Sequence, residues 1–321
     1  MSTILVTGCA GFIGSHLTEK LLADGHDVVG VDNFDPFYPR TIKERNMAGF
    51  HQNPRFQFFE INLADPGMVN RLPVDEVDVV VHLAGKAGVR PSIQDPLGYI
   101  DANITATQNL LNRMRDGKRN KLVFASSSSV YGNTPETPYH EDMDVSNPIS
   151  PYAFTKKACE LLNYTYHHLY GIDMINLRFF TVYGPRQRPD LAIHKFTHLI
   201  RTGRPIPVFG DGSTARDYTF VADTVDGISR AIRYVTDHQS VYEIINLGNH
   251  TPVSLSDLIH HLALATGTTP VLDRKPMQPG DVNITFADIS RAKSLLGYDP
   301  KTQLQAGLKV FVNWYDSVYG M

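Results

Sequence analysis

The chain has 321 residues, of which 30 are lysine or arginine, 33 are aspartate or glutamate and 42% are apolar. This length is enough for one large domain or two interlocked ones, and the balanced charge excludes the basic surface of a nucleic-acid-binding protein. Cys9 and Cys159 are too few for a disulfide framework, and the sequence contains neither a signal peptide nor a long apolar span. We therefore expect a cytoplasmic protein with no membrane and no nucleic-acid partner.

A glycine-rich turn follows the first predicted strand. Residues 4–7 form an apolar run of strand type, and they lead through Gly8, Gly11 and Gly14 into a predicted helix over 15–24. Glycine adopts backbone angles closed to other residues and lets the chain approach a pyrophosphate, which the N-terminus of the following helix attracts. One glycine motif is weak evidence by itself, and a turn that binds no nucleotide is the alternative interpretation.

The second predicted strand supports the nucleotide interpretation. It covers residues 28–31 and ends in Asp32, at the distance expected for a carboxylate that hydrogen-bonds the ribose of an adenosine. A carboxylate at this position repels the 2′-phosphate of NADP. The sequence therefore predicts NAD as the cofactor.

The first half of the chain alternates strand-like and helix-like segments. Its apolar strands are nearly continuous, which is typical of a parallel sheet covered on both faces, so we predict an α/β protein with a doubly wound (Rossmann) sheet. Ligands of such sheets bind outside the carboxyl ends of the strands, and segments 84–88 and 126–129 each follow a strand. The further predicted strands are 56–61, 77–83, 122–126 and 174–178, and the further predicted helices are 97–115 and 152–170.

Tyr152 and Lys156 are the candidate catalytic pair. They are four residues apart at the start of a predicted helix, so they share one face, and Pro151 suits the first helical turn. A phenol titrates near pH ~10 on its own, and a neighbouring cation lowers that pKa, so that Tyr152 can take and return a hydroxyl proton. The alternative is a tyrosine that packs on a helix beside an unrelated lysine, because this spacing alone is common.

Taken together, these motifs resemble the extended short-chain dehydrogenases/reductases, specifically the nucleotide-sugar epimerases and dehydratases. The resemblance continues almost to the C-terminus and implies that NAD contacts the glycine turn and the strand ends. One departure is Asn62, where many relatives have aspartate near the adenine. The motifs are 7–14, 32–33, 82–84, 126–132, 152–156, 177–185, 210–212, 216–219 and 278–282, and the implied NAD contacts are Gly8, Gly11, Phe12, Ile13, Gly14, Asp32, Asn33, Asn62, Leu63, Leu83, Ala84, Lys86, Tyr152 and Lys156.

The resemblance also implies a mechanism. In this family NAD takes a hydride from C4 of the sugar, the tyrosine takes the proton of the 4-hydroxyl, and the 4-keto sugar turns before both return to the opposite face. A serine or threonine before the V-Y-G sequence, here Ser127, hydrogen-bonds the sugar oxygen. Ser128 and Ser129 are alternatives for that contact. NAD is regenerated in each turnover, so no external redox partner is expected.

By the same resemblance, residues 1–180 form the NAD-binding domain, to which residues 215–250 return, and residues 181–321 mainly bind the nucleotide sugar. Guanidinium groups suit a UDP pyrophosphate because they donate hydrogen bonds in a fork. Arg216 is expected at the diphosphate, Asp281 at the uridine ribose, and the backbone of 207–209, including Phe209, at the uracil. Arg186 and Arg188 are either further ligands or solvated loop charges.

Segments 87–92, 183–190 and 277–282 resemble the UDP-glucuronate 4-epimerases in particular, which predicts interconversion of UDP-glucuronate and UDP-galacturonate. A sugar carboxylate in a partly dry pocket needs hydrogen-bond donors or a cation. Neutral-hexose epimerases usually have other residues at Thr181 and Gln278. The candidate substrate contacts are Arg90, Ser128, Ser129, Thr181, Arg188, Phe209, Arg216, Gln278 and Asp281.

Four alternatives stay open. UDP-glucose or an N-acetylhexosamine can be the substrate instead, or the protein can be a non-catalytic NAD sensor, although intact Ser127, Tyr152 and Lys156 favour an enzyme. A dehydratase or a UDP-glucuronate decarboxylase is disfavoured, because those relatives have acidic residues where Ser128 and Ser129 stand.

No metal site is expected. His194 and His198 have the helical spacing of zinc ligands, but no glutamate follows the first histidine and no acidic or cysteine cluster accompanies them. Relatives pair through two long helices per subunit, so a homodimer through 97–115 and 152–170 is the expectation.

Overall fold

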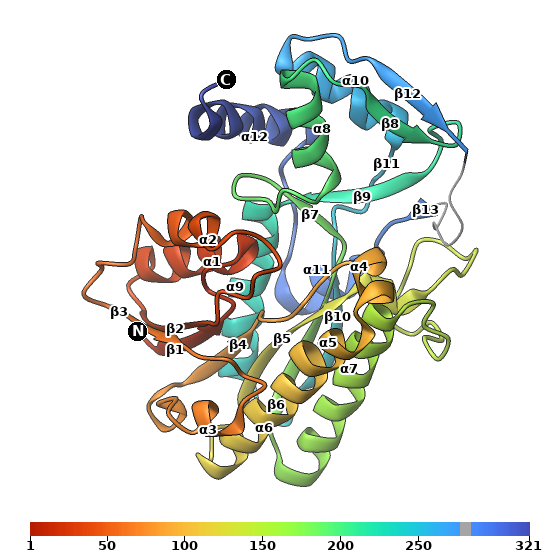
Figure 1. The fold of residues 1–321 in the computed structure, drawn as a ribbon. Coiled ribbons are helices and arrows are strands. Elements are labelled where there is room, and N and C mark those ends of the chain that lie inside the picture. Colours follow the sequence, from red (N-terminus) through yellow and green to blue (C-terminus); the bar gives the residue numbers. More distant parts are fainter. Residues whose placement is uncertain (277–283) are drawn as a thin grey trace.

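The computed structural model describes residues 1–276 and 284–321. Its centre is a seven-stranded sheet in the order β10-β6-β5-β4-β1-β2-β3, in which every neighbouring pair is parallel (Figure 1). The predicted doubly wound α/β class is confirmed. The strands are β1 (Thr3–Thr7), β2 (Asp27–Asp32), β3 (Phe56–Glu60), β4 (Val79–His82), β5 (Lys121–Ser127), β6 (Asp173–Phe179) and β10 (Tyr242–Leu247).

Helices cover both faces of this sheet. Successive strand residues point to opposite faces, so Ile4 and Val6 join one apolar core while Leu5 joins the other. The first core is completed by α1 (Phe12–Ala23), α9 (Val221–Asp237) and α11 (Ser290–Leu296), and the second by α3 (Pro66–Val69), α6 (Ala106–Asp116) and α7 (Pro151–Tyr170). The inner strands are therefore buried on both sides, as their continuous apolar sequences predict, whereas the edge strand β3 stays partly exposed.

A smaller α/β part lies beyond the large sheet and has its own apolar core (Figure 1). Both chain halves are interleaved, because the chain returns from this part through α9 and β10 to the large sheet. The smaller part contains β7 (Thr181–Tyr183), α8 (Ala192–Arg201), β8 (Ile206–Phe209), β9 (Ala215–Phe220), β11 (Pro252–Ser254), α10 (Leu255–Thr266), β12 (Leu272–Lys275), β13 (Ile284–Thr285) and α12 (Leu304–Tyr319). Within the described part of the chain, no helix has the length and apolarity needed to cross a membrane.

The helix predicted over 97–115 is present, because the chain is helical from Pro96 to Asp116, but it is not a regular α-helix. The structure divides this stretch into α5 (Pro96–Tyr99), a π-helical segment (Ile100–Thr105) and α6. The wider π turn carries Asn103, whose side chain bonds both peptide groups of Lys86, at 2.8 and 3.0 Å, and the hydroxyl of Thr155, at 2.9 Å. Helical periodicity in a sequence does not reveal such a turn, because it depends on partners from distant segments.

The other described elements are short. The first helix begins at Phe12, earlier than the predicted residue 15, because the glycine turn runs directly into it. The other short elements are α2 (Arg40–Met47), α4 (Val89–Gln94) and two 3₁₀ turns, Val74–Glu76 and Ser128–Tyr131.

One buried ion pair ties α7 to the sheet. Glu160 and Arg178 are each 1% exposed, and two nitrogens of the guanidinium donate to the two carboxylate oxygens at 2.9 Å. The hydroxyl of Ser126, near the end of β5, donates to the same carboxylate at 2.6 Å. Since Ser126 pairs with Arg178 in the sheet register, one carboxylate joins β5, β6 and α7.

This arrangement predicts the effect of Glu160→Ala. The substitution leaves the Arg178 guanidinium buried without its carboxylate, which typically costs about 3–5 kcal/mol of unfolding free energy. Urea unfolding followed by circular dichroism measures the loss. The double variant Glu160→Leu with Arg178→Met replaces both charges by apolar groups and should recover most of the stability. If the unfolding free energy of Glu160→Ala lay within about 1 kcal/mol of wild type, the stabilising role of this ion pair would be contradicted.

Candidate active site

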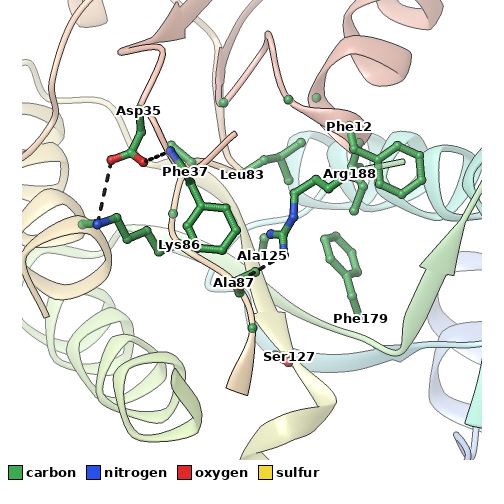
Figure 2. A pocket seen from close by; sticks show the side chains of 18 of the residues that line it. Phe12, Asp35, Phe37, Leu83, Lys86, Ala87, Ala125, Ser127, Phe179 and Arg188 are labelled. Carbon is green, nitrogen blue, oxygen red and sulfur yellow. Dashed lines mark hydrogen bonds and ion pairs between the residues drawn. The ribbon is translucent and has the colours of Figure 1, made fainter. Parts of the chain in front are cut away.

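A cleft of about 450 Å³ opens at the carboxyl ends of β1, β2, β4 and β5. Most predicted site residues line it, together with residues that no sequence motif indicated, such as Phe37 (Figure 2). The predicted residues brought together here are Gly8, Gly11, Phe12, Ile13, Gly14, Asp32, Asn33, Asn62, Leu63, Leu83, Ala84, Lys86, Ser127, Ser128, Ser129, Tyr152, Lys156, Thr181 and Arg188.

The glycine turn leaves no room for side chains. Gly8 has a φ of +72°, and a Cβ on Gly14 would lie 2.1 Å from the carbonyl oxygen of Gly8. A Cβ on Gly8 would lie 2.9 Å from the amide nitrogen of Ala84. The turn therefore packs against the end of β4 and presents bare backbone at the N-terminus of α1, which fits the pyrophosphate of a dinucleotide.

His82 connects the ends of β1 and β4 beneath the glycine turn. Its ring nitrogens lie 2.7 Å from the hydroxyl of Thr7 and 3.1 Å from that of Thr107, and burial lowers the pKa of His82 to about 3. Thr7 also accepts a hydrogen bond from the amide of Ala84 at 3.0 Å. A neutral imidazole thus fixes the ends of β1 and β4 at the point where the strand order reverses.

Asp32 lies in the corner expected for the adenosine ribose. Its carboxylate accepts hydrogen bonds from the amides of Phe34, at 2.8 Å, and Ala10, at 3.2 Å. The ammonium of Lys43 lies 3.7 Å from the same carboxylate. Lys43 and Tyr38 also line the cleft, and the sequence analysis missed both, because they lie outside the glycine motif and only the folded turn brings them back to Asp32.

The start of α7 places the candidate catalytic pair. Ser150 caps the helix by accepting a hydrogen bond from the amide of Ala153 at 3.1 Å, and Pro151 occupies the first turn. Lys156 is buried and donates to the carbonyl oxygen of Ala125 at 2.8 Å, which ties the helix to β5. Tyr152 and the serine run at the end of β5 consequently face the same cleft.

The surroundings of Tyr152 act in opposite directions on its acidity. Burial raises the pKa of the phenol, whereas a hydrogen bond with Ser127 and the positive charge of Arg188 lower it. Burial lowers the pKa of Lys156, whereas the nearby Cys159 and Glu160 raise it. The sequence predicts Lys156 as the cation that lowers the pKa of the phenol, whereas in the structure the positive charge that lowers it is that of Arg188, from a distant loop.

Arg188 bridges three loops at the mouth of the cleft. It donates to the carbonyl oxygen of Ala87 at 3.1 Å, pairs with Asp190 at 2.8 Å and has its guanidinium carbon 4.9 Å from the centre of the Phe37 ring. Figure 2 shows the side chain reaching past Phe37 toward Ala87. Its positive charge therefore borders both the cofactor loops and the serine run.

Five predicted substrate residues are not among the described residues that line this cleft. Arg90 and Phe209 meet each other, with the guanidinium 5.7 Å from the ring centre, and Arg216 lies on β9 and bonds the carbonyl oxygen of Ala215 at 2.8 Å. Gln278 and Asp281 fall outside the described residues.

No cluster of metal ligands is present among the described residues. His194 lies 3.3 Å from the hydroxyl of Tyr319, and its burial lowers its pKa to about 4, while His198 contacts the hydroxyl of Tyr315 at 2.9 Å. His194 thus belongs to the aromatic packing between α8 and α12, and His198 joins the same two helices through its hydrogen bond.

Comparisons with known proteins agree with this geometry. The family described as "GDP-mannose 4,6 dehydratase" matches residues 5–311. The chain is 43% identical to a UDP-glucuronate 4-epimerase of Thermodesulfobacterium geofontis over 317 residues, which is 98% of this chain and 96% of the relative.

Solved structures of UDP-sugar 4-epimerases have a similar fold. A UDP-glucuronic acid 4-epimerase of Bacillus cereus, crystallised with UDP-glucuronic acid and NAD, superposes with a TM-score of 0.91 at 37% identity and covers 99% of this chain and 100% of that one. A UDP-glucose 4-epimerase of Thermotoga maritima superposes with a TM-score of 0.89 at 31% identity, with 99% of both chains covered. The chain belongs to the NAD-dependent epimerase and dehydratase family of nucleotide-sugar enzymes.

Proposed function

We propose that the protein is an NAD-dependent epimerase that interconverts UDP-glucuronate and UDP-galacturonate at C4. The observation that carries this proposal is that Tyr152, Lys156 and three consecutive serines face a bare glycine turn across one cleft. Relatives named UDP-glucuronate 4-epimerase support the choice of substrate. NAD, when bound, supplies the hydride acceptor and donor at C4 of the sugar.

Tyr152 moves the proton. Burial raises the pKa of its phenol, and Ser127 and Arg188 offset part of that rise. In its deprotonated form the phenol takes the proton of the 4-hydroxyl as the sugar becomes a 4-ketone. Ser127 hydrogen-bonds the same oxygen and keeps it within reach of the phenol. After the ketone has turned, the phenol returns the proton to the oxygen on the opposite face, so the protein ends each cycle unchanged.

Lys156 holds the cofactor in register with Tyr152. Its ammonium is anchored by the carbonyl oxygen of Ala125, which leaves two further N–H donors for ribose hydroxyls. Because Lys156 and Tyr152 lie one helical turn apart, the cofactor and the proton acceptor are positioned by one rigid element.

The serine run and Thr181 suit the sugar carboxylate. Ser128, Ser129 and Thr181 line the cleft beside Ser127, and Arg188 adds a positive charge. Oxidation at C4 creates a β-keto acid, which loses carbon dioxide when its carboxylate is perpendicular to the ketone. We assign these hydroxyl donors the task of keeping the carboxylate out of that orientation.

The smaller part is proposed to hold the nucleotide. Phe209 and Arg216 supply an aromatic face and a guanidinium group there, and Arg90 of α4 adds a second guanidinium beside the Phe209 ring. Gln278 and Asp281 are further candidates. Under this proposal, residues 1–180 and 215–250 form the NAD-binding domain, and most of 181–321 forms the nucleotide-sugar domain.

We also propose a homodimer in the cytoplasm. Five large apolar side chains of α7 are exposed, and three of them, Phe154 (47% exposed), Leu161 (57%) and Tyr164 (54%), form one stripe through their helical spacing. Cys9 and Cys159 are both free and buried, in keeping with a reducing compartment.

Tyr152→Phe tests the catalytic assignment. The variant should keep the fold and bound NAD but lose about 10²–10⁴-fold in kcat, because only the titrating oxygen is removed. Product formation is followed by chromatography of the two UDP-uronates, and bound NAD is measured after denaturation. Turnover close to that of wild type would rule out Tyr152 as the proton acceptor.

Ser127→Ala is the companion variant. It keeps the phenol but removes a hydrogen bond that lowers its pKa, so the phenol deprotonates at higher pH. The rise of kcat with pH should therefore shift to higher pH than in wild type. An unchanged pH profile would assign the contact to Ser128 or Ser129.

Thr181→Ala tests the substrate assignment. Wild type should have a higher kcat/KM for UDP-glucuronate than for UDP-glucose, and the variant should lose about tenfold on the uronate, since hydrogen bonds to charged groups contribute about 1.5–3 kcal/mol. Thr181→Ser keeps the hydroxyl and serves as the control. A preference of wild type for UDP-glucose would defeat the assignment.

Leu161→Glu tests the dimer. A charge in the proposed interface should convert the protein to monomers in sedimentation velocity, because a buried unpaired carboxylate is costly. Leu264→Glu, at a position 66% exposed on α10, is the matched control and should stay dimeric. Equal behaviour of the two variants would exclude α7 as the interface.

A further inference from the structure

A buried lysine lies beside Asp32 in the cleft. Lys43 is 6% exposed, its ammonium lies 3.7 Å from the Asp32 carboxylate, and it donates to the carbonyl oxygen of Asp35 at 3.0 Å. The same ammonium lies 4.9 Å from the centre of the Tyr38 ring. All four residues line the cleft, so this cation belongs to the corner that faces the adenosine ribose.

The two charges compensate each other. An ammonium removed from water is costly unless an anion or several acceptors replace the water, and here Asp32 is the nearby carboxylate. Asp32 in turn is fixed by the amides of Phe34 and Ala10. The ammonium of Lys43 is therefore already in place in this corner, and its partner is the Asp32 carboxylate, which is the group that repels a 2′-phosphate.

We propose that Lys43 is a second determinant of dinucleotide choice, which makes this corner a latent NADP site that the Asp32 carboxylate keeps closed. With Asp32 present, the carboxylate accepts the ribose hydroxyls and occupies Lys43. With its charge removed, Lys43 is left as a buried cation at the place where a 2′-phosphate arrives. This inference rests on the proposed use of a dinucleotide and adds the residue that decides which one.

The other cations of the cleft are less suited to this role. Lys86 pairs with Asp95 at 3.2 Å and with Asp35 at 4.0 Å, as Figure 2 shows in part, and Arg188 pairs with Asp190. Lys156 bonds the carbonyl oxygen of Ala125. These three cations pair with partners other than Asp32.

Arg40 of the same helix is also engaged elsewhere. It is exposed, and it forms ion pairs with Glu44 and Glu60 on the surface. Among the described residues that line the cleft, Lys43 is thus the cation whose removal should cancel binding of a 2′-phosphate.

The test compares four proteins purified with their bound dinucleotide: wild type, Asp32→Asn, Asp32→Asn with Lys43→Met, and Asp32→Asn with Lys43→Arg. Asparagine keeps the size of the carboxylate and one of the two oxygens that accept the backbone amides of Phe34 and Ala10. The dinucleotide is released by denaturation, and the ratio of NADP to NAD is measured by mass spectrometry. The shift of the thermal midpoint on addition of NADP or NAD gives a second reading on protein that purifies empty.

Wild type should release NAD, and Asp32→Asn should raise the NADP to NAD ratio about tenfold or more, as expected for a charge-assisted contact to phosphate. Lys43→Met should remove most of that gain, whereas Lys43→Arg should keep it. An equal gain with and without Lys43 would overturn the inference, and so would no gain in Asp32→Asn. The ratio is read without turnover, so failure of the proposed epimerase activity is distinguishable from failure of this inference.

Discussion

The seating of α7 on β5 is the constraint on which the site depends. Lys156 bonds the carbonyl of Ala125, and one turn later Glu160 bonds Ser126 and Arg178. These contacts fix the height of the helix against the strand end that carries Ser127. A proton acceptor is useful only within about 3 Å of its hydroxyl, so a small slip between the two elements would separate Tyr152 from the serine run.

The same contacts carry a cost in folding free energy, because they remove charged groups from water. Glu160, Arg178 and Lys156 all lie out of water, and burial alone would make each unfavourable. The ion pair between Glu160 and Arg178 offsets part of this cost. Burial lowers the pKa of Lys156, and the charge of Glu160 opposes that effect. The cofactor corner repeats the pattern with Asp32 and Lys43. Buried charges are thus placed in compensating pairs, at the two positions where a dinucleotide has to be held.

Local patterns predicted much of this structure. Apolar runs located the strands, and the glycine turn, Asp32 and the four-residue spacing of Tyr152 and Lys156 predicted the cleft, because each depends on residues close in the sequence. The strand order then brought segments 84–88 and 126–129 together, as expected for parallel strands that end at one edge.

The remainder depends on distant partners. The side chain of Asn103, in the π turn, bonds Lys86 and Thr155, and Arg188 comes to the cleft through the packing of its loop on Ala87 and Phe37. Lys43 lies in a helix that carries no motif, and its role appears only when the chain folds back on Asp32. No local pattern in the sequence marks such contacts.

Under the proposed mechanism, the hydrogen on C4 leaves that carbon and returns to it without exchanging with water. UDP-glucuronate labelled with deuterium at C4 tests it directly, with mass spectrometry and NMR of the UDP-galacturonate formed in ordinary water. We expect the deuterium to stay at C4 through many turnovers, while the proton handled by Tyr152 exchanges freely. Replacement of the C4 deuterium by solvent hydrogen at the rate of turnover would contradict it.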